Sequence, residues 1–288
     1  MTWQLFLSAY LALATVGFLL RRRLAQTFAK YNRLVHGFFF IAVLYPLGLV
    51  VAFMTSPSLA IGWVNFFILL AGSAVYPVIN LLAFRASKDV DAGLFTILHN
   101  LTPIVTITAA SLLLHERLND QQLLGAVIII TSAFLATLPR LARRSKSSSA
   151  GILLALASVA LLGLAIVYER WMLTRMDFGA YLVFGWGAQT LWMTIIAWPE
   201  RKKLHVLRKM KHFVPVFSYG LAYALKGLCF VAALKLSGNA SAVGAFASFL
   251  AVLVVLAAYV ALKERELLWL KLGAAAVGTV GLIILNTG

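Results

Sequence analysis

Apolar residues follow one another in long runs along this chain, and polar residues are largely confined to the short stretches between them. The run 123–138 is apolar on nearly every helical face, whereas a membrane β-strand alternates apolar and polar positions. A run of about 20 residues is long enough to cross a bilayer as a helix. We therefore predict ten transmembrane helices. They cover residues 3–20, 34–54, 62–84, 93–114, 121–138, 151–168, 179–198, 213–234, 239–261 and 268–286.

Composition also indicates a membrane protein. Hydrophobic residues make up 62% of the 288 positions and charged residues only 12%, a far more apolar balance than that of soluble domains. No basic residue precedes the first apolar run, and Arg21 to Arg23 follow it, which is unlike a signal peptide. We expect this run to stay in the mature protein. Cys229 is the only cysteine, so an internal disulfide is impossible.

The basic residues indicate how the chain is threaded. The net charge is +16, and most loop Lys and Arg residues lie in the first, third, fifth, seventh and ninth loops. The positive-inside tendency places these loops in the cytoplasm and both termini outside the plasma membrane. Anionic lipid explains charge beside membrane spans, so the expected partner is the lipid bilayer and not nucleic acid.

One stretch of the sequence occurs twice. HERLNDQQLLGA (115–126) is matched by KERELLWLKLGA (263–274) at a constant offset of 148 residues. The same register extends upstream, where Asn100 falls on Ser248. The sequence therefore contains an internal repeat.

Each copy of the repeated stretch begins between two predicted helices, and we call this part a corner. Each corner carries an acidic residue and is followed by small residues. Glu116 and Glu264, each followed by an arginine, are expected to fasten a tight turn and not to act in catalysis. Leu-Gly-Ala follows each corner, and Ala274 and Gly278 lie four residues apart, so helices can approach closely there. We expect the fifth and tenth helices to be packing helices.

The repeat divides the chain into two five-helix halves, residues 1–139 and 151–288, joined by a basic cytoplasmic linker at 140–150. Because five is odd, the second half must enter the membrane upside down, and equivalent loops should carry opposite basic bias. They do: loop one is more basic than its equivalent, loop six, and loop two has no basic residue whereas loop seven has many. The predicted fold is an all-α integral membrane protein with ten transmembrane helices, arranged as two inverted-topology repeats around a central cavity. This architecture is typical of secondary transporters.

The chain resembles the drug/metabolite transporter superfamily, specifically its ten-helix EamA-type branch with two EamA-like repeats. The resemblance rests on Pro103 in the fourth span, on HERL before QQLLGA, and on KERELL before LKLGA. It extends over essentially the whole chain, although Ala251 stands where Pro103 would repeat. It implies a carrier of small solutes whose cavity is lined by the first four helices of each half, with the fifth helices peripheral.

Polar side chains inside apolar helices must face protein or water, which nominates residues for a cavity wall. Tyr76 and Asn80 share a face of the third helix, and His99, Asn100 and Pro103 share a face of the fourth. Pro103 removes the helical donor to the carbonyl of His99. The resulting kink is a candidate hinge, a ligand contact or only a packing feature. His99 is a candidate proton relay, since histidine titrates near neutrality, or a partner in a helix-to-helix hydrogen bond.

Lys226 is the least ordinary residue of the chain, because an ionised side chain near the bilayer centre is costly unless it is paired or hydrated. It shares a face of the eighth helix with Tyr219 and Tyr223. One interpretation is a lysine that snorkels or binds backbone carbonyls. Another is a counter-charge for an anionic group on a substrate. A retinal Schiff base is disfavoured, because no span supplies the acidic counter-ion.

Further residues of the spans are candidates for the wall, with helix packing or interfacial anchoring as the alternative role. Trp186 and Gln189 are the strongest, because they lie together on one broad face of the seventh helix. The others are Gln4, Ser8 and Thr15 of the first helix, Ser73 of the third, Trp192 of the seventh, and Ser241, Gly244 and Ser248 of the ninth.

Acidic residues are predicted to be absent from the interior of the spans. Glu169 comes nearest, and we expect it to form an interfacial pair with Arg170 at the outer end of the sixth helix. Transporters of cationic drugs commonly use a buried carboxylate. Its expected absence, together with Lys226, favours anions or zwitterions.

These observations predict a secondary active transporter that exports a small metabolite, such as an amino acid or a carboxylate- or phosphate-bearing solute, across the plasma membrane by alternating access. A coupling proton or counter-substrate is a further expected ligand, and the expected state is a monomer or weak dimer. The alternatives are efflux of cationic or aromatic drugs, translocation of a lipid-linked anion, or a membrane-embedded sensor. An enzyme is disfavoured, because no nucleophile with a base, metal-ligand spacing or phosphate-binding glycine loop is visible, and no cofactor or metal is expected.

Overall fold

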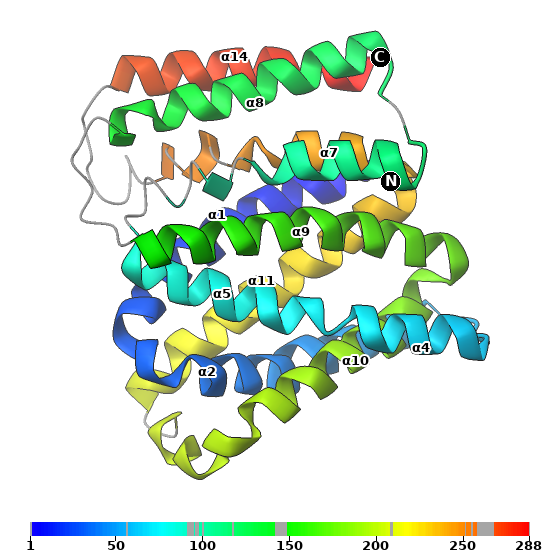
Figure 1. The fold of residues 1–288 in the computed structure, drawn as a ribbon, viewed down its shortest axis with the longest axis vertical. Coiled ribbons are helices and arrows are strands. Elements are labelled where there is room, and N and C mark those ends of the chain that lie inside the picture. Colours follow the sequence, from blue (N-terminus) through cyan, green and yellow to red (C-terminus); the bar gives the residue numbers. More distant parts are fainter. Residues whose placement is uncertain are drawn as a thin grey trace.

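A computed structural model presents the chain as a bundle of helices (Figure 1). Every regular element in the described part of the chain is helical. The two chain ends lie at the same end of the bundle. The structure describes residues 2–55, 57–90, 95, 98–99, 101–116, 118–141, 149–207, 210–250, 252–254, 256–257 and 268–287.

The helices follow the predicted apolar runs along the chain. Those of the first half are α1 (Trp3–Phe28), the 3₁₀ turn η1 (Ala29–Tyr31), α2 (Asn32–Phe39), the π-helical segment η2 (Phe40–Leu44), α3 (Tyr45–Met54), α4 (Trp63–Gly72), α5 (Val75–Asp89), α7 (Thr102–Leu113) and α8 (Asp120–Leu141). Those of the second half are α9 (Ser149–Arg175), α10 (Phe178–Ala197), the 3₁₀ segment η3 (Trp198–Leu207), α11 (Met210–Ser237), α12 (Ala240–Ala247) and α14 (Leu268–Thr287).

Six helical segments of the described chain are long and apolar enough to cross a membrane: Trp3–Phe28, Asn32–Met54, Trp63–Asp89, Ser149–Arg175, Phe178–Leu207 and His212–Ser237. Large apolar side chains such as Phe53, Trp63 and Leu153 lie on their outer faces, each more than half exposed. Surfaces of this kind suit contact with lipid. The total of ten spans and the division into two inverted repeats remain predictions.

Two helices continue beyond the apolar runs that predicted them. The predicted ends are residues 20 and 168, but α1 ends at Phe28 and α9 at Arg175. Arginine and glutamate are good helix formers, so a charged residue ends an apolar run without ending the helix. Arg21 and Glu169 consequently lie inside helices, about two turns before the end of each.

The third predicted span is interrupted between α4 and α5. The N–H of Ala74 donates to the carbonyl of Ala71, three residues back, and not to that of Leu70, four residues back. The carbonyl of Leu70 therefore lacks its usual helical donor. The indole N–H of Trp192 donates to that carbonyl at 2.7 Å. The hydroxyl of Tyr168 donates to the carbonyl of Ile68 at 3.0 Å. Side chains of α9 and α10 thus stabilise the break.

The fourth span is not the continuous kinked helix that the sequence predicts. His99 is helical, Leu101 lies in a turn, and α7 begins at Thr102 with Pro103 in its first turn. A proline at this position removes no intrahelical hydrogen bond, because the first N–H groups of a helix have no partner. A turn at 248–249 interrupts the ninth span in the same way, after α12.

A π-helical segment lies within the second span. The five residues of η2 directly precede α3, whose first turn contains Pro46. Proline cannot supply the N–H that would close a regular helical bond to the residue four positions earlier, so the ladder widens there. Phe40 and Leu44, the two ends of η2, both lie on the wall of the cavity described below.

The helices pack in pairs that cross between the halves of the chain. α1 packs on α11 and α5 packs on α9, while α7 packs on α12 and α3 on α10. α8 and α14 pack mainly on each other and lie apart from the rest, at the top of Figure 1. Gly125 of α8 approaches the backbone of α14 so closely that an added Cβ would lie 2.6 Å from the N atom of Leu285. This confirms close packing at the first Leu-Gly-Ala, but Gly273 has no neighbour within 4 Å of an added Cβ.

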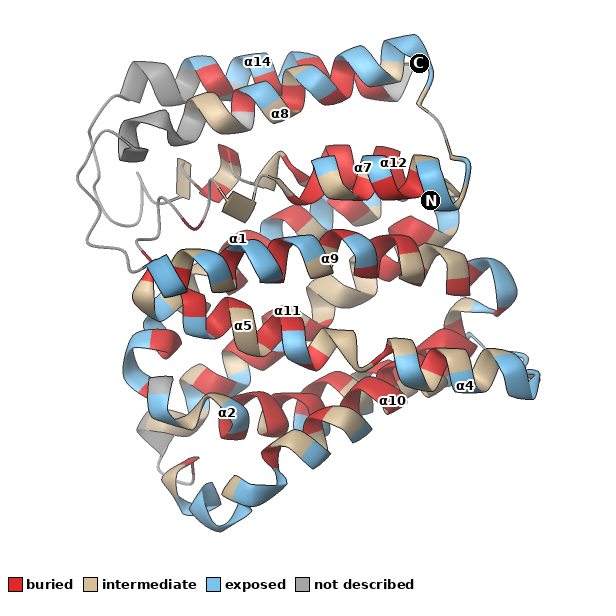
Figure 2. Ribbon diagram, viewed as in Figure 1, coloured by how far each residue is buried: buried red, intermediate tan, exposed pale blue. Residues whose placement is uncertain are grey.

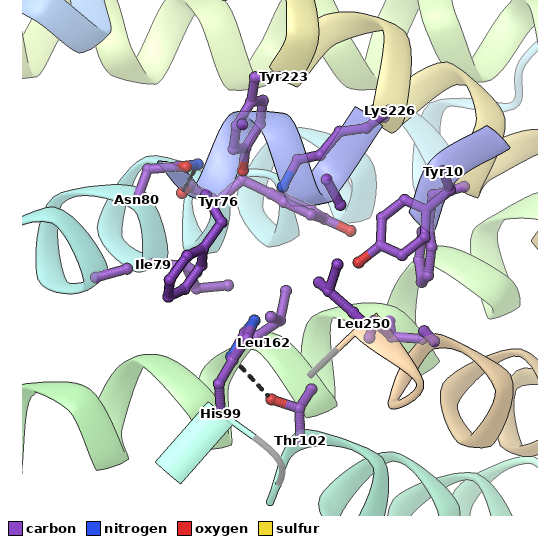
Figure 3. A pocket seen from close by; sticks show the side chains of 18 of the residues that line it. Tyr10, Tyr76, Ile79, Asn80, His99, Thr102, Leu162, Tyr223, Lys226 and Leu250 are labelled. Carbon is purple, nitrogen blue, oxygen red and sulfur yellow. Dashed lines mark hydrogen bonds between the residues drawn. The ribbon is translucent and has the colours of Figure 1, made fainter. Parts of the chain in front are cut away.

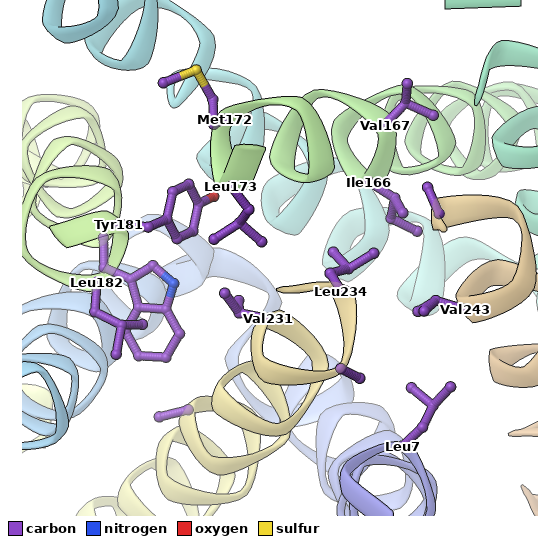
Figure 4. Packing of buried hydrophobic residues seen from close by; sticks show 14 of the residues in the cluster. Leu7, Ile166, Val167, Met172, Leu173, Tyr181, Leu182, Val231, Leu234 and Val243 are labelled. Atoms are coloured by element: carbon purple, nitrogen blue, oxygen red, sulfur yellow. The ribbon is translucent and has the colours of Figure 1, made fainter. Parts of the chain in front are cut away.

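Buried residues concentrate where α9, α10 and α11 meet (Figure 2). Their largest cluster includes Met172 and Leu173 of α9, Tyr181 of α10, and Val231 and Leu234 of α11 (Figure 4). This cluster closes the bundle next to the cavity. It fixes the two aromatic-rich helices α10 and α11 that supply part of the cavity wall.

Candidate binding cavity

A cavity of about 190 Å³ lies at the centre of the bundle. Side chains of α1, η2, α5, α7, α9, α10, α11 and α12 line it, so both halves of the chain contribute. In Figure 3, Tyr10, Tyr76, His99, Tyr223 and Lys226 converge on one space from different helices. The volume is below the range of about 300–1,000 Å³ that is common for drug-sized ligands.

The structure brings the predicted site residues together. The lining residues include Tyr76, Asn80, His99, Pro103, Trp186, Gln189, Tyr219, Tyr223 and Lys226. Asn100, the remaining candidate, lies outside the described residues. The shared location follows from the spacing of polar residues on α5, α10 and α11. Binding of a substrate by these residues stays a prediction.

Lys226 faces the cavity without a counter-ion in the described part of the chain. Its Nζ lies 4.1 Å from the centroid of the Tyr223 ring, a cation–π distance. It forms no ion pair or hydrogen bond with any described residue, whereas Lys235 on the same helix donates to the carbonyls of Leu173 and Met176. Within the described chain, Lys226 therefore does not bind backbone carbonyls, and its charge is directed at the cavity.

Polar groups surround this lysine. The amide of Asn80 donates to the carbonyl of Tyr76 at 2.9 Å, and the hydroxyl of Tyr76 donates to the carbonyl of Ala165 at 3.2 Å. Tyr219 is 1% exposed, and its hydroxyl has no partner in the described chain. Together with Gln189, these groups offer hydrogen-bond donors and acceptors inside an apolar wall.

His99 and Pro103 lie where the fourth span is interrupted. The ring of His99 stacks against that of Phe95, and its Nδ1 lies 3.4 Å from the hydroxyl of Thr102 (Figure 3). This contact joins neighbouring residues of one span, not two helices as the hydrogen-bond interpretation expected. Thr106, one turn further along α7, contacts the carbonyl of Gly163 at 3.4 Å. The proposed hinge at Pro103 remains untested.

None of the α1 residues that line the cavity was predicted. Arg21, assigned to a loop from the sequence, lies on the cavity wall with its guanidinium 5.3 Å from the ring of Phe18 and 4.9 Å from that of Phe95. Tyr10 lies on the same face of α1 and packs against Phe230 of α11. The predicted wall residues of this helix, Gln4, Ser8 and Thr15, are not on the cavity. The hydroxyls of Ser8 and Thr15 donate to carbonyls of their own helix instead.

Glu169 contradicts the expectation that the interior of the spans contains no acid. Its side chain is 4% exposed and lies on the cavity wall. The pairing expected with Arg170 is also wrong, because Arg170 binds Glu116 instead. Consecutive residues of a helix point about 100° apart, so Glu169 faces the interior while Arg170 faces the loop after α7. The electrostatic preference for anions derived from the sequence must therefore be revised.

Other wall candidates have structural roles. Trp192 and Ser73 do not line the cavity; Trp192 donates to Leu70, and the hydroxyl of Ser73 lies 3.4 Å from the carbonyl of Gly185. Ser241 is fully buried outside the cavity, with its hydroxyl unpartnered in the described chain. Gly244 and Ser248, in contrast, do line the cavity.

The first repeated corner contacts the second half of the chain. Oε1 of Glu116 accepts from Nε of Arg170 at 3.1 Å, and Oε2 accepts from the N–H of Ala240 at 2.7 Å. Arg170 also donates to the carbonyl of Gly238 at 2.7 Å. A carboxylate is favourable at the N-terminus of a helix, here α12. Glu116 is thus structural, as expected, but its partner belongs to the other half of the chain; Glu264 lies outside the described residues.

Local sequence explains why this corner folds. His115 adopts a left-handed conformation with φ 55°, which ends α7, and the N–H of Glu116 donates to the carbonyl of Ala110. α8 then begins with a capping box in which Asn119 and Gln122 each accept the backbone N–H of the other. The corner presents Glu116 to the second half of the chain.

The helices and their lipid-compatible surfaces define an integral membrane protein. Residues 2–138 match the model of the EamA-like transporter family. Over these residues the chain is similar to the EamA-like transporters, which are part of the drug/metabolite transporter superfamily.

Nearly the whole chain shares its fold with a solved structure. One crystal structure, described only as "Crystal structure of protein", superposes with a TM-score of 0.68 at 16% sequence identity. The superposition covers 96% of this chain and 98% of that one. No functionally curated protein matches the sequence.

Proposed function

We propose that this protein is a secondary active transporter that exports a small metabolite bearing a carboxylate or phosphate across the plasma membrane. The substrate binds in the central cavity, and two inverted five-helix repeats expose that cavity to alternate sides of the membrane. The observation that carries the proposal is Lys226, a cation that faces the central cavity without a counter-ion among the described residues.

The cavity wall supports the repeat architecture. The offset of 148 residues, which relates the two corners in the sequence, also relates residues that line the cavity. These pairs are Tyr10 and Ser158, Ala14 and Leu162, Phe18 and Ile166, Arg21 and Glu169, Ile79 and Gly227, Ala83 and Val231, His99 and Ala247, and Thr102 and Leu250. A site formed at the interface of two equivalent repeats would have such a wall.

Helix packing supports the same relation. A shift of 148 residues places α1 on α9 and α5 on α11. The contact between α1 and α11 is therefore equivalent to the contact between α9 and α5, and both contacts are present. α8 corresponds to α14, and these helices pack on each other. A pseudo-two-fold axis through the cavity accounts for all three contacts.

Size and charge support a small anionic or zwitterionic substrate. The cavity is smaller than pockets for drug-sized ligands. An unpaired ammonium near the bilayer centre is costly unless a ligand or water compensates its charge. A substrate carboxylate or phosphate would supply that compensation.

Efflux of small organic cations is a second candidate, because Glu169 lines the cavity. Its carboxylate would attract a cation, as in carriers of cationic drugs. Lys226 and Arg21 line the same cavity and oppose such a ligand electrostatically. This opposition favours the first candidate.

The test is ligand-dependent thermal stabilisation of the detergent-purified protein. Amino acids, organic acids, phosphate esters and quaternary amines are compared, because a ligand that binds only the folded state raises its stability. We expect saturable stabilisation by anions or zwitterions. Lys226→Ala should abolish it, and Lys226→Arg should retain part of it.

Lys202→Ala is the matched control, since Lys202 is an exposed lysine outside the cavity. It should leave every shift unchanged. Uptake of the stabilising solute into sealed vesicles then distinguishes a carrier from a sensor. Stabilisation by quaternary amines alone, unchanged by Lys226→Ala, would favour the cation candidate and overturn the first.

A further inference from the structure

We propose that the cavity is bipolar and selects zwitterions, with Glu169 receiving the substrate ammonium and Lys226 receiving the carboxylate. This inference deepens the proposed transport function and rests on it. It gives Glu169 a role in substrate binding, which a purely anionic substrate does not.

Glu169 lacks a cationic partner among the described residues. No described Lys or Arg forms an ion pair with it, and the adjacent Arg170 is engaged by Glu116 and Gly238. Glu169 is nevertheless only 4% exposed and lines the cavity. A carboxylate in such surroundings is costly without a partner. A ligand cation in the cavity would supply that partner.

Tyrosine hydroxyls next to Glu169 complete a site for an ammonium group. Glu169 lies beside the hydroxyls of Tyr76 and Tyr181. Tyr181 is fully buried, and its hydroxyl has no hydrogen-bond partner in the described chain. An ammonium group has three N–H donors and no acceptor. Carboxylate and hydroxyl oxygens are the acceptors that such a group requires.

Two basic residues, Lys226 and Arg21, line the same cavity as Glu169. Lys226 and Arg21 interact electrostatically with each other and with His99. Tyr223, another lining residue, is within electrostatic reach of both Arg21 and Glu169. The cation–π contact places Nζ of Lys226 against the same tyrosine ring. A substrate next to Tyr223 would therefore be within reach of both charges.

The internal repeat gives a reason for this polarity. Arg21 and Glu169 are 148 residues apart and occupy equivalent positions on α1 and α9. Opposite charges at equivalent positions of two inverted repeats would lie at opposite ends of a shared cavity. A simple anion leaves Glu169 uncompensated, and a simple cation leaves Lys226 uncompensated. A zwitterion compensates both.

The experiment measures binding of the standard α-amino acids to the purified full-length protein by isothermal titration calorimetry. Each amino acid that binds is compared with its N-acetyl derivative, which lacks the ammonium, and its methyl ester, which lacks the carboxylate. We expect each modification to raise the Kd at least about tenfold, the usual effect of losing one charge-assisted hydrogen bond.

Two cavity variants separate the poles. Glu169→Gln should raise the Kd of the amino acid to that of its N-acetyl derivative, without changing the Kd of the derivative. Lys226→Ala should weaken the amino acid and the N-acetyl derivative but not the methyl ester. Asp120→Asn, which removes an exposed carboxylate at the start of the peripheral helix α8, is the matched control and should change neither.

The outcomes distinguish this inference from the function on which it rests. If N-acetyl derivatives bind the unmodified protein as tightly as the amino acids, the bipolar site is wrong and an anion carrier stands. If no amino acid binds but organic acids or phosphate esters do, the bipolar site is wrong in the same way. If only quaternary amines bind, both proposals fail. The comparison of derivatives uses the unmodified protein, so it decides the question even where Glu169→Gln fails to fold.

Discussion

Nε of Arg170 lies 3.1 Å from Oε1 of Glu116, and this ion pair joins α9 of the second half to the loop after α7 of the first. Both side chains are about 15% exposed. Glu116 also accepts from Ala240, and Arg170 donates to Gly238, so the pair ties the corner to the start of α12. We expect it to keep the nearby end of the cavity closed. If the halves move relative to each other during transport, these bonds must break.

Glu116→Gln should lower the free energy of unfolding by about 1–3 kcal/mol, the usual cost of removing a hydrogen-bonded charge from a shielded pair. It should also open this end of the cavity more often. Ser241 is fully buried next to Ala240, so a cysteine introduced there reports on opening. With Cys229 replaced by serine, maleimide labelling of Ser241→Cys should be faster in the Glu116→Gln background.

The swap Glu116→Arg with Arg170→Glu provides the control. It restores opposite charges but loses the bonds to the Ala240 N–H and the Gly238 carbonyl, so we expect only partial recovery of slow labelling. Equal labelling rates with and without Glu116→Gln would show that the pair does not close the cavity.

Lys226→Met should stabilise the ligand-free protein while abolishing anion binding. Methionine fills a similar volume, and replacing an uncompensated charge by an apolar group is often stabilising, here by about 1 kcal/mol or more. Thermal unfolding in detergent without ligand measures the effect. A lower melting temperature for Lys226→Met than for the unmodified protein would indicate that the lysine has a structural role.

Hydropathy located the helices but not their interruptions. The break between α4 and α5 depends on Trp192 and Tyr168, which are more than 90 residues away in the sequence, and a single-sequence pattern does not contain that pairing. Pro103 indicated a disturbance in the fourth span, but the second half has a turn at 248–249 without a proline at the equivalent position. Tertiary contacts therefore determine the breaks as much as proline does.

Polar stripes located the parts of the site on α5, α10 and α11, since an apolar helix with polar residues on one face must direct them inward. The cavity face of α1 was missed because Tyr10 and Phe18 have the composition of a packing face. Glu169 was missed because it directly follows an apolar run, and the continuation of α9 for another six residues is not visible in hydropathy. Glu169 lies 148 residues after Arg21, the offset of the internal repeat, and this relation was the sequence signal that indicated an equivalent position.

Trp192→Phe should destabilise the protein without affecting ligand binding. Phenylalanine leaves the carbonyl of Leu70 unpaired, at a cost of about 1–3 kcal/mol. Trp192 does not line the cavity, so the Kd of any ligand should stay constant. Chemical unfolding and calorimetric titration measure the two quantities. If Trp192→Phe changes the free energy of ligand binding by more than the free energy of unfolding, Trp192 takes part in binding.

The contact between α8 and α14 predicts opposite effects for two glycine substitutions. At Gly125 an added Cβ would lie 2.6 Å from the N atom of Leu285 and 2.9 Å from the carbonyl oxygen of Gly281, and backbone atoms cannot rotate away. Gly125→Ala should therefore force the helices apart and lower the free energy of unfolding by about 1–3 kcal/mol.

Gly273→Ala is the matched control, because no atom lies within 4 Å of an added Cβ and Gly273 is within α14. It should raise stability by up to about 1 kcal/mol, since alanine favours the helix more than glycine does. Thermal unfolding of both variants measures the difference. Ligand affinity should be unchanged in each, because neither helix lines the cavity. Equal stability of the two variants would mean that the close approach of α8 to α14 does not contribute to the folded state.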